Sequence, residues 1–170
     1  MIDKPRTLFL QHEQRRFYWN EPGHLELYKP MIISGLLGEV RTYPFQRDIR
    51  WLEREHGVYN HRLEQANLNG TAAPEKPIWT KENSLEQMLD AVICEFKPDL
   101  VVYALTWPNQ AIPVDILRCL RARYNFKLFS IIWDYDENNS SLMDYDKNII
   151  EASDLVSVAD SYWRLERIKN

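Results

Sequence analysis

Two carboxylates and two amides stand directly after one of the most hydrophobic segments of the sequence. The segment FKLFSIIW, residues 126–133, runs into Asp134, Asp136, Asn138 and Asn139. Oxygens in such a group can bind a hard cation, accept hydrogen bonds from the hydroxyls of a sugar, or face water at the edge of a sheet. Which of these applies depends on the spacing of the residues and on the elements that hold them.

The spacing argues against a metal. Asp134, Asp136 and Asn138 fit the start of a calcium loop, but its sixth position, normally glycine, is Asn139, and its twelfth, normally glutamate, is Tyr145. Single-domain glycosyltransferases that hold a manganese-bound nucleotide sugar on a D-x-D motif are the second alternative. In those enzymes an acceptor region follows the motif, whereas here only 34 residues follow Asp136. We therefore expect no metal and no cofactor.

The surrounding segments alternate between strand-like and helix-like patterns. Continuous apolar runs typical of buried parallel strands alternate with runs of helical periodicity, and one more exposed strand is expected at residues 39–45. This alternation predicts an α/β fold, namely a Rossmann-like three-layer α/β/α sandwich with a mainly parallel sheet. The buried strands are expected at residues 7–11, 100–105, 126–133 and 154–160, and the helices at residues 84–96, 114–124 and 142–152.

The first half of the chain is less regular. Residues 24–37 suit a helix interrupted by Pro30 and closed by Gly38. A short helix over RDIRWLEREHG should stop at Gly57, and residues 58–82, with two prolines and several Asn, Thr and Ala, predict a long loop. In the second half, Ser84 and Gln87 fit a capping box at the start of a helix. We expect residues 1–170 to form a single domain.

In an open parallel sheet, ligands bind outside the carboxyl ends of the strands. The residues directly after the expected strands are therefore the candidate site. They are His12, Glu13 and Arg15, then Thr106, Trp107 and Asn109, then Trp133, Asp134 and Asp136, and finally Ser161.

Composition narrows the classes of function. Net charge is −4 and charged residues make up 27% of the chain, so no basic field favours nucleic acid. The cysteines, Cys94 and Cys119, lack metal-ligand spacing, and we expect reduced, inert, buried thiols in a cytoplasmic protein. No run of about 18 apolar residues predicts a membrane span.

Several catalytic signatures are missing from the sequence. It contains no G-x-G-x-x-G fingerprint, no P-loop, no H-E-x-x-H and no G-x-S-x-G elbow. A receiver-like domain would need an acidic pair after the first strand and a lysine after the fifth, but Glu13 stands alone and the next lysine is Lys169. Phosphate binding on a glycine turn, hydrolysis by a triad and phosphotransfer are therefore disfavoured.

The order of segments resembles a known family. FKPDLVVYAL, a helix, FKLFSIIWDYDENN, and NIIEASDLVSVADSYWRLERI follow one another. This order is similar to the N-terminal half of GT-B glycosyltransferases of the large retaining family that uses nucleotide-sugar donors, in which a "KPD" strand precedes a strand ending in a polar pair and a helix running into "AD" and a serine. The similarity covers residues 84–170, and residues 1–57 only as topology.

The resemblance implies an acceptor-side domain of a glycosyltransferase, completed by a C-terminal domain that binds the nucleotide sugar. His12, Glu13 and Asp134 would then act on a saccharide or lipid-linked acceptor. Its binding would involve Arg15, Thr106, Trp107, Asn109, Trp133, Asp136 and Ser161. A lipid-linked acceptor would bring the domain to the inner face of a membrane, and no nucleic acid is expected as a partner.

The chain also departs from the family. No glycine-rich turn follows the first strand, and Thr106-Trp107 and Trp133-Asp134 stand where the family often carries histidines. The family's paired glutamates belong to the C-terminal domain, so the same eight-residue spacing of Glu13 and Glu21 is a coincidence. A non-catalytic partner-binding or regulatory Rossmann-like subunit would show the same absences and stays open as the alternative function.

Overall fold

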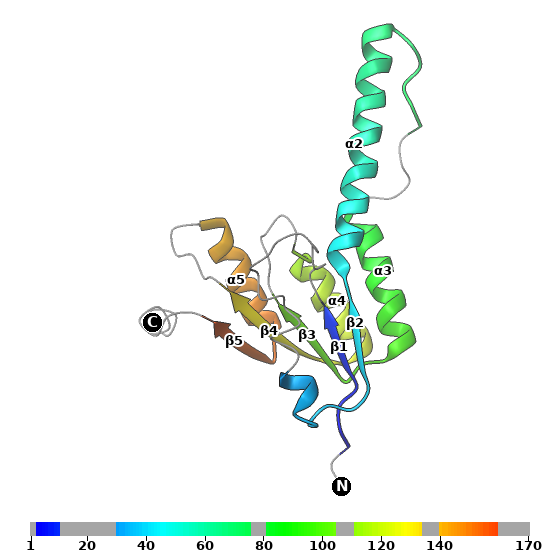
Figure 1. Cartoon of the computed structure of the whole chain (residues 1–170). Helices are drawn as coiled ribbons and strands as arrows, with labels where there is room; N and C mark the ends of the chain where they lie inside the picture. The colour runs from blue at the N-terminus through cyan, green and yellow to red at the C-terminus, as the bar shows by residue number, and fades with distance from the viewer. Residues whose placement is uncertain (1–2, 11–29, 76–80, 105–110, 134–139, 160–170) are drawn as a thin grey trace.

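The fold is an open parallel sheet. The computed structural model describes residues 3–10, 30–75, 81–104, 111–133 and 140–159. Five strands, β1 (Thr7–Leu10), β2 (Val40–Tyr43), β3 (Leu100–Ala104), β4 (Lys127–Trp133) and β5 (Leu155–Ala159), form one sheet in the order β2-β1-β3-β4-β5. Every pairing in it is parallel. The predicted α/β class with a parallel sheet is confirmed, and Figure 1 shows the strands side by side with helices between them in the chain.

In the described part of the chain, four long helices lie between the strands and share one face of the sheet. They are α2 (Phe45–Asn69), α3 (Lys81–Phe96), α4 (Val114–Tyr124) and α5 (Ser140–Ala152). Their apolar residues form one core cluster with alternate residues of the strands, among them Leu8, Val101, Tyr103 and Leu128. Because side chains alternate across a strand, the intervening residues face the other way.

The second face of the sheet carries a smaller cluster. Phe9, Val102, Ala104 and Ile131 are all at most 2% exposed, and the segment 30–37 packs against them through Met31 and Leu37. Strands buried on both faces read as continuous apolar runs, which is why β3 and β4 were recognisable in the sequence.

The expected loop over residues 58–82 is wrong for most of its length. Helix α2 continues through Gly57 to Asn69, and α3 already begins at Lys81. A Cβ atom at Gly57 would meet nothing within 4 Å, and its φ is ordinary, so this glycine only lowers helix propensity without breaking the helix. The helix ends instead at Gly70, which is left-handed with a φ of 63°.

Two further boundaries differ from the sequence prediction. Since α3 begins at Lys81, Ser84 lies inside the helix and is buried, so the capping box with Gln87 is wrong. Of the helix expected over residues 24–37, residues 24–29 lie outside the described part, and the described part is helical only over 30–33. Gly38 therefore does not cap that helix but lies against the chain near Lys4.

Two aspartates set the register at the amino edge of the sheet. Asp99 accepts a hydrogen bond from the backbone N–H of Arg6 (2.8 Å), while its own N–H donates to the carbonyl of Arg6 (2.9 Å). Asp154 forms the same reciprocal pair with Leu128, at 2.9 Å in both directions. Although partial desolvation acts against ionisation, the Leu128 N–H and the cations of Lys127 and Arg121 lower the pKa of Asp154. Asp99, the aspartate of the KPD segment, therefore has a structural role, because it holds β3 in register with β1.

Candidate functional site at the carboxyl edge of the sheet

The strand order places the crevice of the sheet between β1 and β3. The chain passes from β1 outward to β2, returns to β3 on the other side of β1, and continues outward through β4 and β5. In a sheet of order 2-1-3-4-5 this reversal leaves a crevice at the carboxyl ends of β1 and β3, where such folds bind ligands. Leu10 and Ala104 are the last residues of these two strands.

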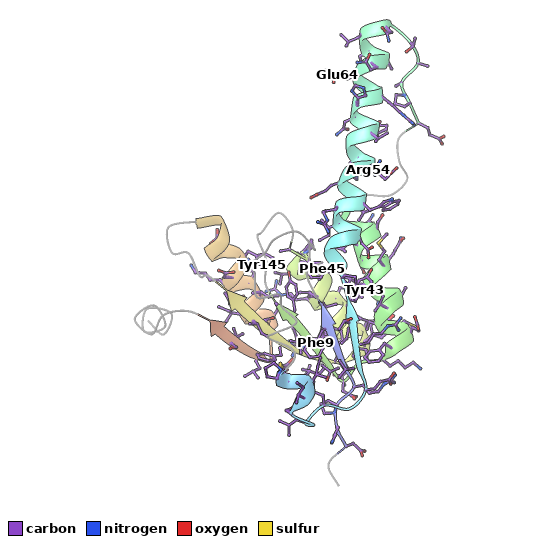
Figure 2. All side chains as sticks on the ribbon, viewed as in Figure 1. Phe9, Tyr43, Phe45, Arg54, Glu64 and Tyr145 are labelled. Atoms are coloured by element: carbon purple, nitrogen blue, oxygen red, sulfur yellow. The ribbon has the colours of Figure 1, made fainter. Side chains whose placement is uncertain are left out.

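Aromatic side chains form one wall near this edge. The rings of Phe45, in the first turn of α2, and Tyr103, in β3, meet edge to face with centroids 5.6 Å apart. Beside them, the hydroxyl of Tyr43 donates to the carboxylate of Asp48. Figure 2 shows Tyr43 and Phe45 where α2 meets the sheet, with Tyr145 near them. The wall thus joins β2, α2, β3 and α5.

Two tyrosines and the backbone N–H and C=O of one residue form a closed ring of hydrogen bonds. The backbone N–H of Ile112 donates to the hydroxyl oxygen of Tyr103 (3.0 Å), and the hydroxyl of Tyr145 donates to the carbonyl of Ile112 (2.7 Å). The two hydroxyl oxygens are 3.0 Å apart. Because Tyr145 has one hydroxyl proton and directs it to Ile112, Tyr103 must donate to Tyr145.

The ring is fixed in its neutral state. Burial raises the pKa of Tyr103 to about 12, against the lowering effect of its hydrogen bonds. Burial and the neighbouring Tyr103 raise the pKa of Tyr145 well above its ordinary value. Both hydroxyls therefore keep their protons at physiological pH and serve to position Ile112. This residue stands two positions before α4 (Val114–Tyr124), so the ring fixes the chain where it enters that helix.

Asp146 is the acid of α5 that is buried in this region. Asp146 is 3% exposed, and desolvation raises the pKa of its carboxyl group from 3.8 to about 6. A carboxyl group with a pKa near 6 is poised between acid and base at neutral pH. Asp146 follows Tyr145 directly in the chain and so lies next to one member of the hydrogen-bonded ring.

Stability should depend on the ionisation of Asp146. Its pKa is higher in the folded chain than in the unfolded chain, so the folded state holds the proton more tightly. Its contribution is complete below about pH 4 and is lost as pH rises through about 6. The loss should be about 1–2 kcal/mol, because partial hydration reduces the full effect of the pKa shift.

Urea unfolding of the wild type and of Asp146→Asn at about pH 4, 6 and 8 measures this loss. The free energy of unfolding of Asp146→Asn relative to wild type should increase by about 1–2 kcal/mol from pH 4 to pH 8. Asp144→Asn, an exposed neighbour on the same helix, is the control and should show no such change. A pH-independent difference between Asp146→Asn and wild type would contradict the assignment.

Almost all site residues expected from the sequence lie outside the described residues. These are His12, Glu13, Arg15, Thr106, Trp107, Asn109, Asp134, Asp136 and Ser161, and the predictions about them stay predictions. Of Trp133 the structure gives the backbone, as the last residue of β4.

The residues that the structure adds to this edge are Tyr103, Tyr145 and Asp146. One sequence signal pointed to the first of them, because a tyrosine inside the apolar run LVVYA needs a partner for its buried hydroxyl. The only sequence signal at Tyr145 is its mismatch to the twelfth position of a calcium loop. Asp146 falls at helical spacing with Ile149 and Ile150 and carried no distinct signal.

The potential metal ligands and the two cysteines can be placed in the part of the chain that the structure describes. No group of three or more His, Cys, Asp or Glu side chains there is arranged to hold a metal ion. Cys94 and Cys119 are free, and both are exposed, so the expectation of buried thiols is wrong. They lie on the outer sides of α3 and α4, whose inner sides carry the apolar residues.

The fold and this edge define a Rossmann-like α/β domain. Its strand order reverses at β1 and β3, and the crevice lies between these two strands. Comparison of the chain with protein-family models, curated proteins and solved structures finds no match. Within the described residues, none of the helices combines the length and the hydropathy that crossing a bilayer requires.

Proposed function

We propose that this chain is the acceptor-binding domain of a glycosyltransferase, with a saccharide or lipid-linked saccharide bound at the carboxyl edge of the sheet. A sugar is transferred to this acceptor from a nucleotide-sugar donor held by a second domain. The supporting observation is the strand order. It puts the crevice between β1 and β3, and the candidate residues follow β1, β3 and β4 directly in the chain.

The residue types agree with this role. His12 and Glu13 come two and three residues after the end of β1, and Thr106 and Trp107 come two and three residues after the end of β3. Aromatic faces stack on sugar rings, and carboxylates accept hydrogen bonds from sugar hydroxyls. A base near the acceptor hydroxyl removes its proton during transfer, and its placement next to the reacting atom lowers the entropic cost.

The described wall supports the same assignment. Tyr103, Tyr145 and Ile112 fix the chain where it enters α4, and a pre-organised position costs less ordering when a ligand binds nearby.

Titration of the chain with a panel of mono- and disaccharides and with UDP-glucose tests the proposal. The chain should bind at least one saccharide and should bind UDP-glucose more weakly, because the donor belongs to the other domain. Trp107→Ala and Asp134→Asn should each weaken saccharide binding about tenfold, or about 1.4 kcal/mol, through lost stacking and hydrogen bonding.

Asp144→Asn is the matched control, since this aspartate is exposed on α5 near the same edge but does not follow a strand. It should bind saccharides like the wild type. Preferential binding of UDP-glucose, or saccharide binding that is unchanged in both Trp107→Ala and Asp134→Asn, would reject the acceptor-side assignment. Failure to bind any saccharide would favour the non-catalytic subunit instead.

A further inference from the structure

The outer half of α2 projects from the body of the domain. Figure 1 shows α2 rising well past the ends of the sheet and of α3, α4 and α5, and Figure 2 shows Arg54 and Glu64 successively farther along it. Its 25 residues correspond to a rod of roughly 37 Å. Only the first part, through Phe45, Ile49 and Leu52, joins the core of the domain. In the outer half, Ala66 is buried and its carbonyl accepts a hydrogen bond from the N–H of Thr71, just after the helix.

This outer half is a poor helix on its own. It contains Gly57 and the asparagines Asn60, Asn67 and Asn69, which all lower helix propensity. Isolated helices of about this length are marginal in water, and most helical stability in proteins comes from packing of a face. A helix with such composition that stands away from the core is therefore a candidate for packing against another molecule.

One stripe of α2, exposed except for the half-buried Glu55, has the pattern of a helix interface. Trp51, Glu55, Val58, Arg62 and Gln65 follow one another at spacings of four, three, four and three residues, which places them along one side of the helix. Trp51 is 48% and Val58 41% exposed. Phe45, Ile49 and Leu52 face a different direction, toward the core. We call these five residues the α2 stripe.

The charges of the α2 stripe on one copy are complementary to those on a second copy that runs in the opposite direction. Glu55 precedes Val58 by three residues, and Arg62 follows it by four. When two copies of α2 run antiparallel with their Val58 side chains opposed, Glu55 of each copy lies within one residue step of Arg62 of the other, on the same side of the interface. In a parallel, in-register pair, Glu55 would face Glu55 and Arg62 would face Arg62, which is repulsive.

We propose that the α2 stripe binds a second copy of this chain, by antiparallel packing of the two helices about Val58. The contact consists of Val58 against Val58 at the centre, Trp51 against the end of the stripe near Gln65, and two Glu55–Arg62 ion pairs. Such a contact is small, and it belongs with the weak and reversible associations. Neither Glu55 nor Arg62 makes an ion pair with another residue among those the structure describes, so both are available.

Reversal of the two charges tests the pairing. The full chain should be measured by sedimentation equilibrium from about 1 to 300 µM, the range in which weak dimers dissociate. Glu55→Arg alone and Arg62→Glu alone should each raise the dissociation constant at least about tenfold, because each places like charges together twice. The double variant Glu55→Arg with Arg62→Glu should return it to within about threefold of wild type.

Crosslinks at two positions test the centre of the contact and the direction of the helices. With Cys94 and Cys119 replaced by serine, Val58→Cys should form a disulfide-linked dimer under mild oxidation, since the two sulfurs lie across the two-fold axis. Leu68→Cys is the matched control on the same helix and is exposed. Two copies of residue 68 in the antiparallel pair are about 30 Å apart along the axis, beyond the reach of a disulfide.

Circular dichroism of each variant should match the wild type, because the changed side chains of the α2 stripe lie at the surface. A chain that is monomeric across the whole range, or single and double charge variants that associate alike, would overturn the proposal. Efficient crosslinking of Leu68→Cys would contradict the antiparallel pair, because it requires the two copies of residue 68 to lie at the same height along the helices. Association that survives both single reversals would point to a different surface.

Discussion

Tyr103→Phe should lower the free energy of unfolding by about 2–3 kcal/mol. The phenyl ring keeps the edge-to-face contact with Phe45 but removes the acceptor for the backbone N–H of Ile112, a fully buried residue. A buried donor left without an acceptor costs about 1–3 kcal/mol, and the hydrogen bond to Tyr145 is lost as well. Urea unfolding at pH 7 measures the change.

A double-mutant cycle with Tyr145→Phe separates the ring from its parts. Tyr145→Phe removes the hydrogen bond to the carbonyl of Ile112, and the double variant should lose less than the sum of the two single losses, by about 1 kcal/mol. Tyr124→Phe is the control, because its hydroxyl bonds the carboxylate of Asp90 in a partly buried position. It should cost less than about 1 kcal/mol. Strict additivity of Tyr103→Phe and Tyr145→Phe would show that no ring acts as a unit.

Gly38→Ala should destabilise the fold by about 2–3 kcal/mol, because it forces two backbone segments apart. A Cβ atom on Gly38 would lie 2.7 Å from the carbonyl oxygen of Lys4 and 3.3 Å from that of Pro5. The same glycine donates its N–H to Pro5 (2.9 Å), and Thr7 donates to Glu39 (2.8 Å), so the substitution disturbs the start of the pairing between β1 and β2. Thermal unfolding should show a midpoint lower by about 5–10 °C.

Gly57→Ala provides the matched contrast for that measurement. Its Cβ atom enters open space inside α2, so the substitution should raise the stability by about 0.5–1 kcal/mol through the unfolded chain and through helix propensity. Equal effects of the two glycine substitutions, in either direction, would be inconsistent with the close approach at Gly38.

The strands could be predicted because burial on both faces leaves a simple signal. β3 and β4 lie next to each other in the sheet, with β3 between β1 and β4, and their sequences are continuous apolar runs. The helices α4 and α5 could be predicted from apolar residues at helical spacing. In each case the local pattern and the tertiary environment agree, which is the condition for a pattern to be informative.

Helix α2 could not be bounded from the sequence because its two halves experience different environments. The inner half is held by Phe45, Ile49 and Leu52 in the core. The outer half contains the composition of a loop, and only the three-dimensional context keeps it helical past Gly57. Tertiary context overrides propensity in this way wherever propensity is weak.

The chemistry of the edge was predictable only to the level of topology. A parallel sheet brings the residues after each strand to one edge, and this expectation needs no knowledge of side-chain contacts. The hydrogen-bonded ring of Tyr103, Ile112 and Tyr145 cannot be predicted without such knowledge, because its members come from β3, α5 and the segment between β3 and α4. Residues 42 apart in sequence meet there for reasons that no local pattern contains.

The pairing of Asp99 with Arg6 has a consequence for biosynthesis. The two residues are 93 positions apart, and β1 bonds to β3 as well as to β2. A nascent chain emerging from the ribosome therefore exposes one side of its first strand until β3, at Leu100–Ala104, has been made. The closure of so long a segment is slow. During that interval the strand is an open template for aggregation, and chaperones that recognise apolar strands should engage this protein early in translation.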